Sequence, residues 1–165
     1  MLSRIRRAAL PILVAIPILA CGLSGAITQA AFVTPCKAQC TAEGADPAIC
    51  ESYCQCSYEY ARDNGRLKEL ENVDVVPGQQ MAPVLVDLLA ECGSDLWDSN
   101  FQRLCVESCQ DGAVCQARCE CFLRELRGTG PREASTRFLV ENLDVAPPTE
   151  AGNRRLEAAE QVCLR

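Results

Sequence analysis

The residues of this sequence that could do chemistry are its cysteines. The chain of 165 residues contains 13 cysteines and no histidine. Cysteine at this density can bind soft metal ions such as Cu(I), exchange thiols with disulfides, or cross-link a small fold. The absence of histidine excludes Ser-His-Asp and Cys-His catalysis, and it excludes zinc sites that combine cysteine with histidine.

Twelve of the cysteines form two sets of six with the same order of spacings. Each set reads F-x3-C-x3-C, a loop, C-x3-C-x-C, a long spacer and a final C. A second signature repeats in the spacer, where residues 71–77 read ENVDVVP and residues 141–147 read ENLDVAP. The sequence therefore predicts a tandem duplication, with one module at 32–92, a linker at 93–100 and a second module at 101–163.

The elements that position these cysteines are predicted to be helices. Thr34-Pro35 and Asp46-Pro47 are typical helix starts, and apolar residues recur at helical spacing from Gln80 to Glu91. Alternating β-branched residues occur only at 73–76. The expected fold class is all-α, with three or four helices in each module.

Helix geometry predicts which cysteines pair. Cysteines at i and i+4 lie one turn apart on the same helix face, so two antiparallel helices bring four sulfurs into register. The next cysteine, two residues on, is rotated by about 200° and is expected to pair with the cysteine of the closing helix. The expected disulfides are Cys36–Cys54, Cys40–Cys50, Cys56–Cys92, Cys105–Cys119, Cys109–Cys115 and Cys121–Cys163. Modules of about 60 residues commonly need such cross-links to be stable.

The paired CX3C motifs resemble those of disulfide-stapled helical-hairpin proteins, which include the small Tim chaperones and the plant α-hairpinins. The resemblance covers residues 36–54 and 105–119, and it implies two helices clamped by two nested disulfides. Residues 53–56, which read YCQC, are also similar to a YCxC element of uncharacterised exported bacterial proteins. That similarity implies a compartment rather than an activity.

Residues 1–30 have the pattern of an export signal. Basic residues precede an apolar core at residues 8–20, and small side chains lead up to Ala30. Cleavage after Ala30 is the first expectation. Lipidation of Cys21 in a lipoprotein signal and retention of the segment as a membrane anchor are the alternatives. Each of these fates places residues 31–165 outside the cytoplasm, in the periplasm or cell envelope, where disulfides persist.

The charge of the exported part limits its partners. The whole chain has 16 basic and 22 acidic side chains, and removal of the three arginines of the signal leaves 13 against 22, a formal charge of −9. An acidic surface excludes nucleic acid as a partner and is repelled by anionic lipid. We therefore expect an envelope protein of unknown identity as the partner, and membrane contact only through a retained N-terminal segment.

The repeated carboxylates and the single tryptophan each have two interpretations. Glu71/Asp74 and Glu141/Asp144 could be acid–base pairs or calcium ligands, but the neighbouring Asn and Pro favour turns that end helices. Trp97 is expected to pack between the modules. No catalytic residue, metal ion or cofactor is expected.

Three functions are compatible with these patterns. The preferred prediction is a non-enzymatic exported or envelope-tethered protein whose two clamped modules bind or scaffold another protein. The first alternative is a Cu(I)-binding or storage protein that uses the CxxxC and CxC thiolates. The second alternative is a thiol–disulfide oxidoreductase that uses a CxC pair, Cys54/Cys56 or Cys119/Cys121.

Overall fold

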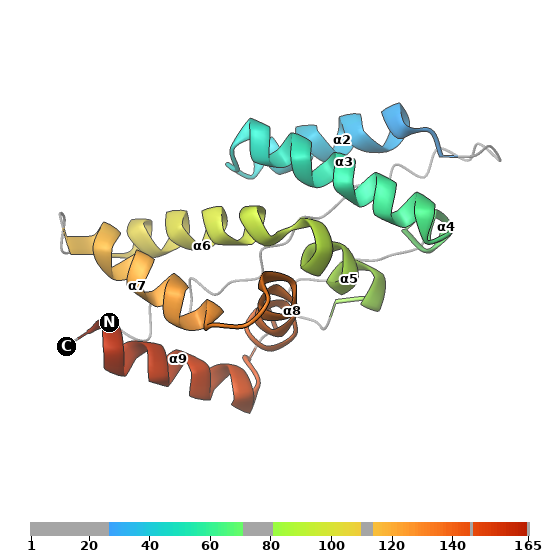
Figure 1. Cartoon of the computed structure of the whole chain (residues 1–165). Helices are drawn as coiled ribbons and strands as arrows, with labels where there is room; N and C mark the ends of the chain where they lie inside the picture. Colours follow the sequence, from blue (N-terminus) through green and yellow to red (C-terminus); the bar gives the residue numbers. More distant parts are fainter. Residues whose placement is uncertain (1–26, 71–80, 110–113, 146, 165) are drawn as a thin grey trace.

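The computed structural model describes residues 27–70, 81–109, 114–145 and 147–164 (Figure 1). The described residues form eight helices and no strand, so the fold is all-α as predicted. No helix in this part of the chain has the length and apolar content needed to cross a bilayer. The predicted signal or anchor segment, with Cys21, lies outside the described residues apart from residues 27–30.

The first module contains α2 (Gln29–Ala42), α3 (Pro47–Asp63), the short α4 (Leu67–Leu70) and α5 (Pro83–Cys92). α2 and α3 form a hairpin whose loop ends at Asp46, and the Asp46 carboxylate caps α3 by accepting hydrogen bonds from two backbone N–H groups. α2 begins earlier than the expected start at Thr34, so Pro35 lies inside the helix. Packing of the buried Phe32 against Tyr58 of α3 supports this extra turn, and the Thr28 side chain caps it.

The second module contains α6 (Ser94–Ser108), α7 (Cys115–Arg127), α8 (Arg132–Asn142) and α9 (Glu150–Cys163). α6 and α7 repeat the hairpin, and α9 closes the module against α7 as α5 closes the first module against α3. Residues 94–100 of the expected linker form the first two turns of α6. The modules therefore join directly, with Gly93 between α5 and α6.

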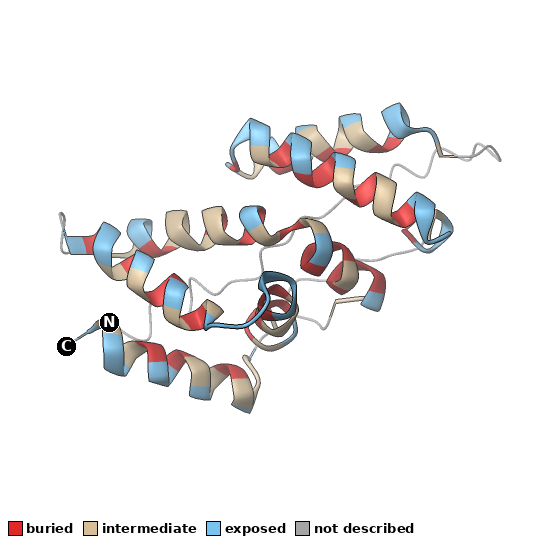
Figure 2. Cartoon of the chain, in the orientation of Figure 1, coloured by how far each residue is buried: buried red, intermediate tan, exposed pale blue. Residues whose placement is uncertain are grey.

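α5 lies at the centre of the molecule and is buried on more than one side (Figure 2). Its Val84, Leu85 and Leu88 belong to a cluster within the first module. Its Val86 and Leu89 belong to a larger cluster that extends from the first hairpin to α8 and α9. The two copies therefore share one continuous core, and α5 connects it to the smaller cluster.

A partly buried polar network fixes the second module around Arg127, at the end of α7. The Arg127 guanidinium forms a salt bridge with Asp98 of α6 and donates to the Ser94 carbonyl oxygen at 3.0 Å. It also donates to the Thr136 hydroxyl of α8. One side chain thus joins α6 and α7 to the first half of α8, the helix whose second half lines the candidate site.

Candidate functional site

All twelve cysteines within the described residues form disulfides. The observed pairs are the six that the cysteine spacing predicts, with Cα–Cα separations of 5.6 to 5.9 Å. The two cysteines of each CxC element form disulfides to different helices. Cys54 is bonded to a cysteine of α2 and Cys56 to one of α5, and the second copy repeats this with α6 and α9. The described part of the chain contains no cluster of three or more His, Cys, Asp or Glu side chains that could hold a metal ion.

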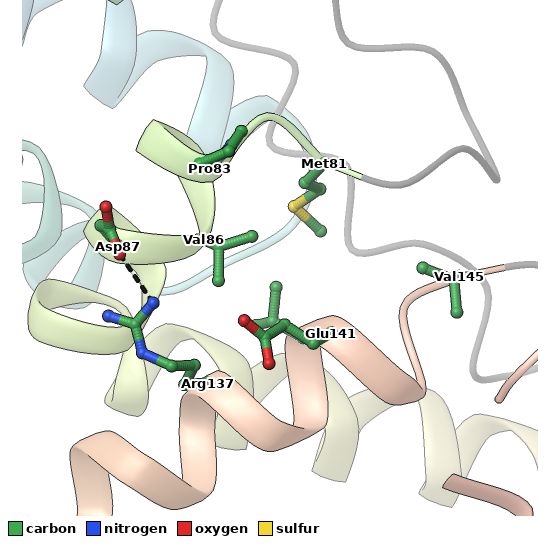
Figure 3. A pocket seen from close by; sticks show the side chains of 8 residues that line it. Met81, Pro83, Val86, Asp87, Arg137, Glu141 and Val145 are labelled. Atoms are coloured by element: carbon green, nitrogen blue, oxygen red, sulfur yellow. Dashed lines mark hydrogen bonds and ion pairs between the residues drawn. The ribbon is translucent and has the colours of Figure 1, made fainter. Parts of the chain in front are cut away.

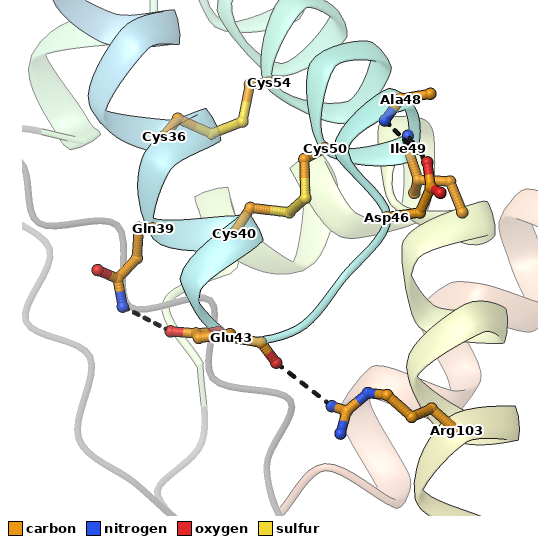
Figure 4. The surroundings of a disulfide bond; sticks show 10 residues. All are labelled: Cys36, Gln39, Cys40, Glu43, Asp46, Ala48, Ile49, Cys50, Cys54 and Arg103. Atoms are coloured by element: carbon orange, nitrogen blue, oxygen red, sulfur yellow. Dashed lines mark hydrogen bonds between the residues drawn. A yellow bond between two sulfur atoms is a disulfide. The ribbon is translucent and has the colours of Figure 1, made fainter.

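The first hairpin shows how the nested disulfides are enclosed (Figure 4). Cys36, Cys40, Cys50 and Cys54 each have at most 1% of their surface exposed. The hairpin loop is tied to the second module, because Arg103 of α6 donates to the Glu43 carbonyl oxygen at 3.4 Å. The sulfurs therefore act as interior cross-links, closed to a reductant or a metal ion.

A pocket lies between α5 and α8, where the two modules meet (Figure 3). It has a volume of about 110 Å³. Most of its lining is apolar, and the charged side chains lie on its sides. The lining residues are Met81, Pro83, Val86, Asp87, Arg137, Val140, Glu141 and Val145. Val86 and Val140 are buried, so they form the floor, one from each helix.

An ion-pair network holds one side of this pocket. Asp87 of α5 forms salt bridges with Arg66, which follows α3, and with Arg137 of α8 at 2.6 Å. Hydrogen bonds from the Arg66 guanidinium, then from Arg137, lower the pKa of Asp87. The network crosses the module boundary and keeps Asp87 ionised, so it fixes the separation of α5 and α8.

Two carboxylates meet further along the same helix pair. Glu91 of α5 forms a hydrogen bond with Glu133 of α8, and this hydrogen bond raises the pKa of Glu91. Burial and charge repulsion from Glu133 raise it further. The charge of Arg137 on α8 offsets part of this repulsion. This end of the α5–α8 pair therefore carries excess negative charge.

Glu141 supplies a further carboxylate at the pocket rim. Its side chain extends from α8 toward Val86 of α5, as Figure 3 shows. It is exposed, and it forms no salt bridge or hydrogen bond with any residue that the structure describes. It lies within electrostatic range of Arg137, whose guanidinium is already paired with Asp87, so its charge is only partly compensated. Its charge is available to a ligand.

The second carboxylate of the same signature, Asp144, lies in the interior. It is 2% exposed, and its Oδ2 accepts a hydrogen bond of 3.1 Å from the indole Nε1 of Trp97. Burial raises the pKa of Asp144 to about 7, and the indole N–H offsets only part of that cost. Trp97 stacks on Phe101 with ring centroids 5.4 Å apart. Trp97 also belongs to the core cluster that the two modules share, as the sequence suggested.

The turn interpretation of the signature is correct for its asparagine. α8 ends at Asn142, whose side chain and backbone oxygens both accept hydrogen bonds from Thr149, the N-cap of α9. The interpretation missed the different environments of the two acids, one at a pocket rim and one buried. The copies Glu71 and Asp74 lie outside the described residues.

Most pocket residues were not candidates from the sequence. Asp87 and Arg137 are 50 positions apart in the sequence, and their salt bridge shows that they lie at the same site. The one sequence feature that pointed to the pocket was the repeated signature at 141–147, which contains Glu141 and Val145. No family model, curated protein or solved structure matches the chain at a significant level.

Proposed function

We propose that this small, disulfide-rich helical protein is a non-enzymatic exported protein that binds or scaffolds another protein of the cell envelope. The observation that carries the proposal is the use of the cysteines. Every cysteine of the described residues cross-links two helices, and no described thiol is left for metal binding or electron transfer.

The disulfide connectivity favours this function over the two alternatives. A CxC redox pair would need a bridge between Cys54 and Cys56, but those cysteines are bonded to two other helices. A Cu(I) site needs thiolates, and sulfurs oxidised to disulfides do not provide them. A rigid frame with a preformed pocket is typical of a protein that binds without a large conformational cost.

The disulfides also support export. Six disulfides in one small chain are stable in an oxidising compartment and are rare in the cytosol. Cleavage after Ala30, lipidation at Cys21 and retention as an anchor are each compatible with this location. The resemblance to twin-CX3C hairpin proteins adds only a shared way of clamping two helices.

Site-specific photo-cross-linking in intact cells tests the binding function. A photo-reactive residue is introduced in place of Glu141 at the pocket rim, and separately in place of Glu120 on the exposed face of α7 as the matched control. We expect a discrete adduct with another protein from position 141 and none from position 120. Absence of an adduct from position 141 and from further exposed positions along α5 and α8 would contradict the proposal.

A further inference from the structure

We propose that the pocket between α5 and α8 docks a basic segment of the partner protein, which inserts one Leu- or Met-sized side chain and places a neighbouring Lys or Arg against Glu141. This inference rests on the proposed binding function and specifies the chemistry of the partner.

The volume of the pocket sets the size of the inserted group. A cavity of about 150 Å³ holds benzene, whereas this pocket has about 110 Å³. A branched or thioether side chain of four heavy atoms fits that space. The thioether of Met81 lines the mouth, and its flexibility allows a close fit around an aliphatic group.

The pocket is held open by the frame around it. α5 is linked to α3 by the Cys56–Cys92 disulfide, and Asp87 is held by guanidiniums from two other segments. The floor residues Val86 and Val140 are packed in the shared core. A ligand therefore finds the pocket formed before it binds, which lowers the entropic cost of docking.

The charges around the pocket select a basic neighbour. Four carboxylates lie along the α5–α8 pair, those of Asp87, Glu91, Glu133 and Glu141. Two guanidiniums, those of Arg66 and Arg137, form salt bridges with Asp87. Arg66 is shared with a further carboxylate, that of Glu69. A Lys or Arg beside the inserted group pairs with Glu141, and the further carboxylates of Glu91 and Glu133 along the same helix pair add to the attraction for a basic segment.

The overall charge argues against a second copy of the chain and against a membrane surface as the occupant. The exported part carries 22 acidic against 13 basic side chains. Two such copies repel each other, and so do the protein and anionic lipid. A basic protein segment is the occupant that the pocket and the charge favour together.

Met81 provides a single reporter for this docking, because it is the only methionine after Met1. The oxidised protein is prepared with ¹³C-methyl methionine, and its methyl resonance is followed by NMR while the peptide acetyl-Gly-Leu-Lys-Gly-amide is added. We expect a saturable shift. Replacement of Leu by Ala in the peptide should weaken binding by about tenfold or more.

The charge requirement is tested separately from the apolar one. Replacement of Lys by Glu in the peptide, or Glu141→Gln in the protein, should weaken binding by about two- to fivefold, as expected for an exposed charge pair. Glu120→Gln on α7 should leave the affinity unchanged. Preservation of the Met81 resonance position in the free variants shows that they are folded.

Three results would overturn the inference: no shift with the Leu-Lys peptide, equal binding of the Leu-Glu peptide, or a Met81 shift that depends on protein concentration alone and so reports self-association. If the peptides fail while a photo-reactive residue at position 141 still captures a partner, the partner chemistry is wrong and the binding function stands. If neither result is obtained, both proposals fail.

Discussion

Asp144→Asn tests the unusual buried carboxyl of the second module. Asn has nearly the same shape and keeps a carbonyl oxygen that accepts the Trp97 N–H, but it cannot ionise. Asp144 faces the indole of Trp97 and no cation that forms a salt bridge with it among the described residues. Arg127 lies over the Trp97 ring, 5.5 Å from its centroid, and is already paired with Asp98.

The sign and size of the effect follow from the pKa. The pKa of Asp144 rises from its usual 3.8 to about 7 in the folded protein. Between these values the folded state keeps a proton that the unfolded state has lost, so the free energy of unfolding falls as the pH rises through this window. At about 1.4 kcal/mol per pKa unit, the total loss is up to about 4 kcal/mol above pH 7. Asp144→Asn should therefore match the parent protein below pH 4 and be the more stable of the two at pH 8.

Urea unfolding of both oxidised proteins at several pH values measures this difference. The unfolding midpoint of the variant should exceed that of the parent by about 1 M or more at pH 8, and the two should converge near pH 4. Trp97 is the only tryptophan, so its fluorescence should also titrate with a midpoint near pH 7 in the parent and not in the variant. A variant that is less stable at pH 8, or that keeps the same pH profile, would refute the reasoning.

Two further predictions concern close packing and the cross-links. Gly152→Ala should destabilise the fold by about 1–3 kcal/mol, because the new Cβ would lie 2.3 Å from the Asn142 carbonyl oxygen. Gly130 has open space around it, so Gly130→Ala should change the stability by less than about 1 kcal/mol. Thermal unfolding measures both differences. Replacement of both cysteines of Cys121–Cys163 by Ser should cost about 4 kcal/mol, and the same change at Cys109–Cys115 should cost about 2 kcal/mol, since their sequence separations are 42 and 6. Equal losses in either comparison would contradict these structural explanations.

The cysteine framework was predictable because it depends on local geometry. The i, i+4 spacing fixes which side of a helix carries two sulfurs, and the CxC spacing turns the next sulfur toward another helix. Because the sequence is duplicated, the same pairing applies to the second module. The same local rules predicted the all-α class and the end of α8 at Asn142.

The pocket depends on contacts between modules, which no local rule predicts. The sequence did contain a hint in α5, which is apolar on several faces, as a helix buried on both sides must be. Alignment of the closing cysteines places Val86 of α5 opposite Glu157 of α9 in the repeat. The outer face of α5 therefore has a neighbour, α8, while the corresponding position of α9 is polar and exposed.

The role of Asp144 was missed for a similar reason. A turn explains an Asp before Val-Ala-Pro, and its true partner, Trp97, lies 47 positions earlier. Trp97 was placed in a linker because the repeat alignment begins at Phe101. The α6 helix extends across that linker and brings the indole to the turn.

The intact mass of the exported protein, alkylated under denaturing conditions before and after reduction, tests the central claim most directly. Six interhelical disulfides predict no alkylation of the twelve paired cysteines before reduction and twelve adducts after it. The same spectrum reports cleavage after Ala30 or an acyl group on Cys21. Adducts on any of these twelve cysteines before reduction, or copper that is lost when thiols are alkylated, would contradict the account.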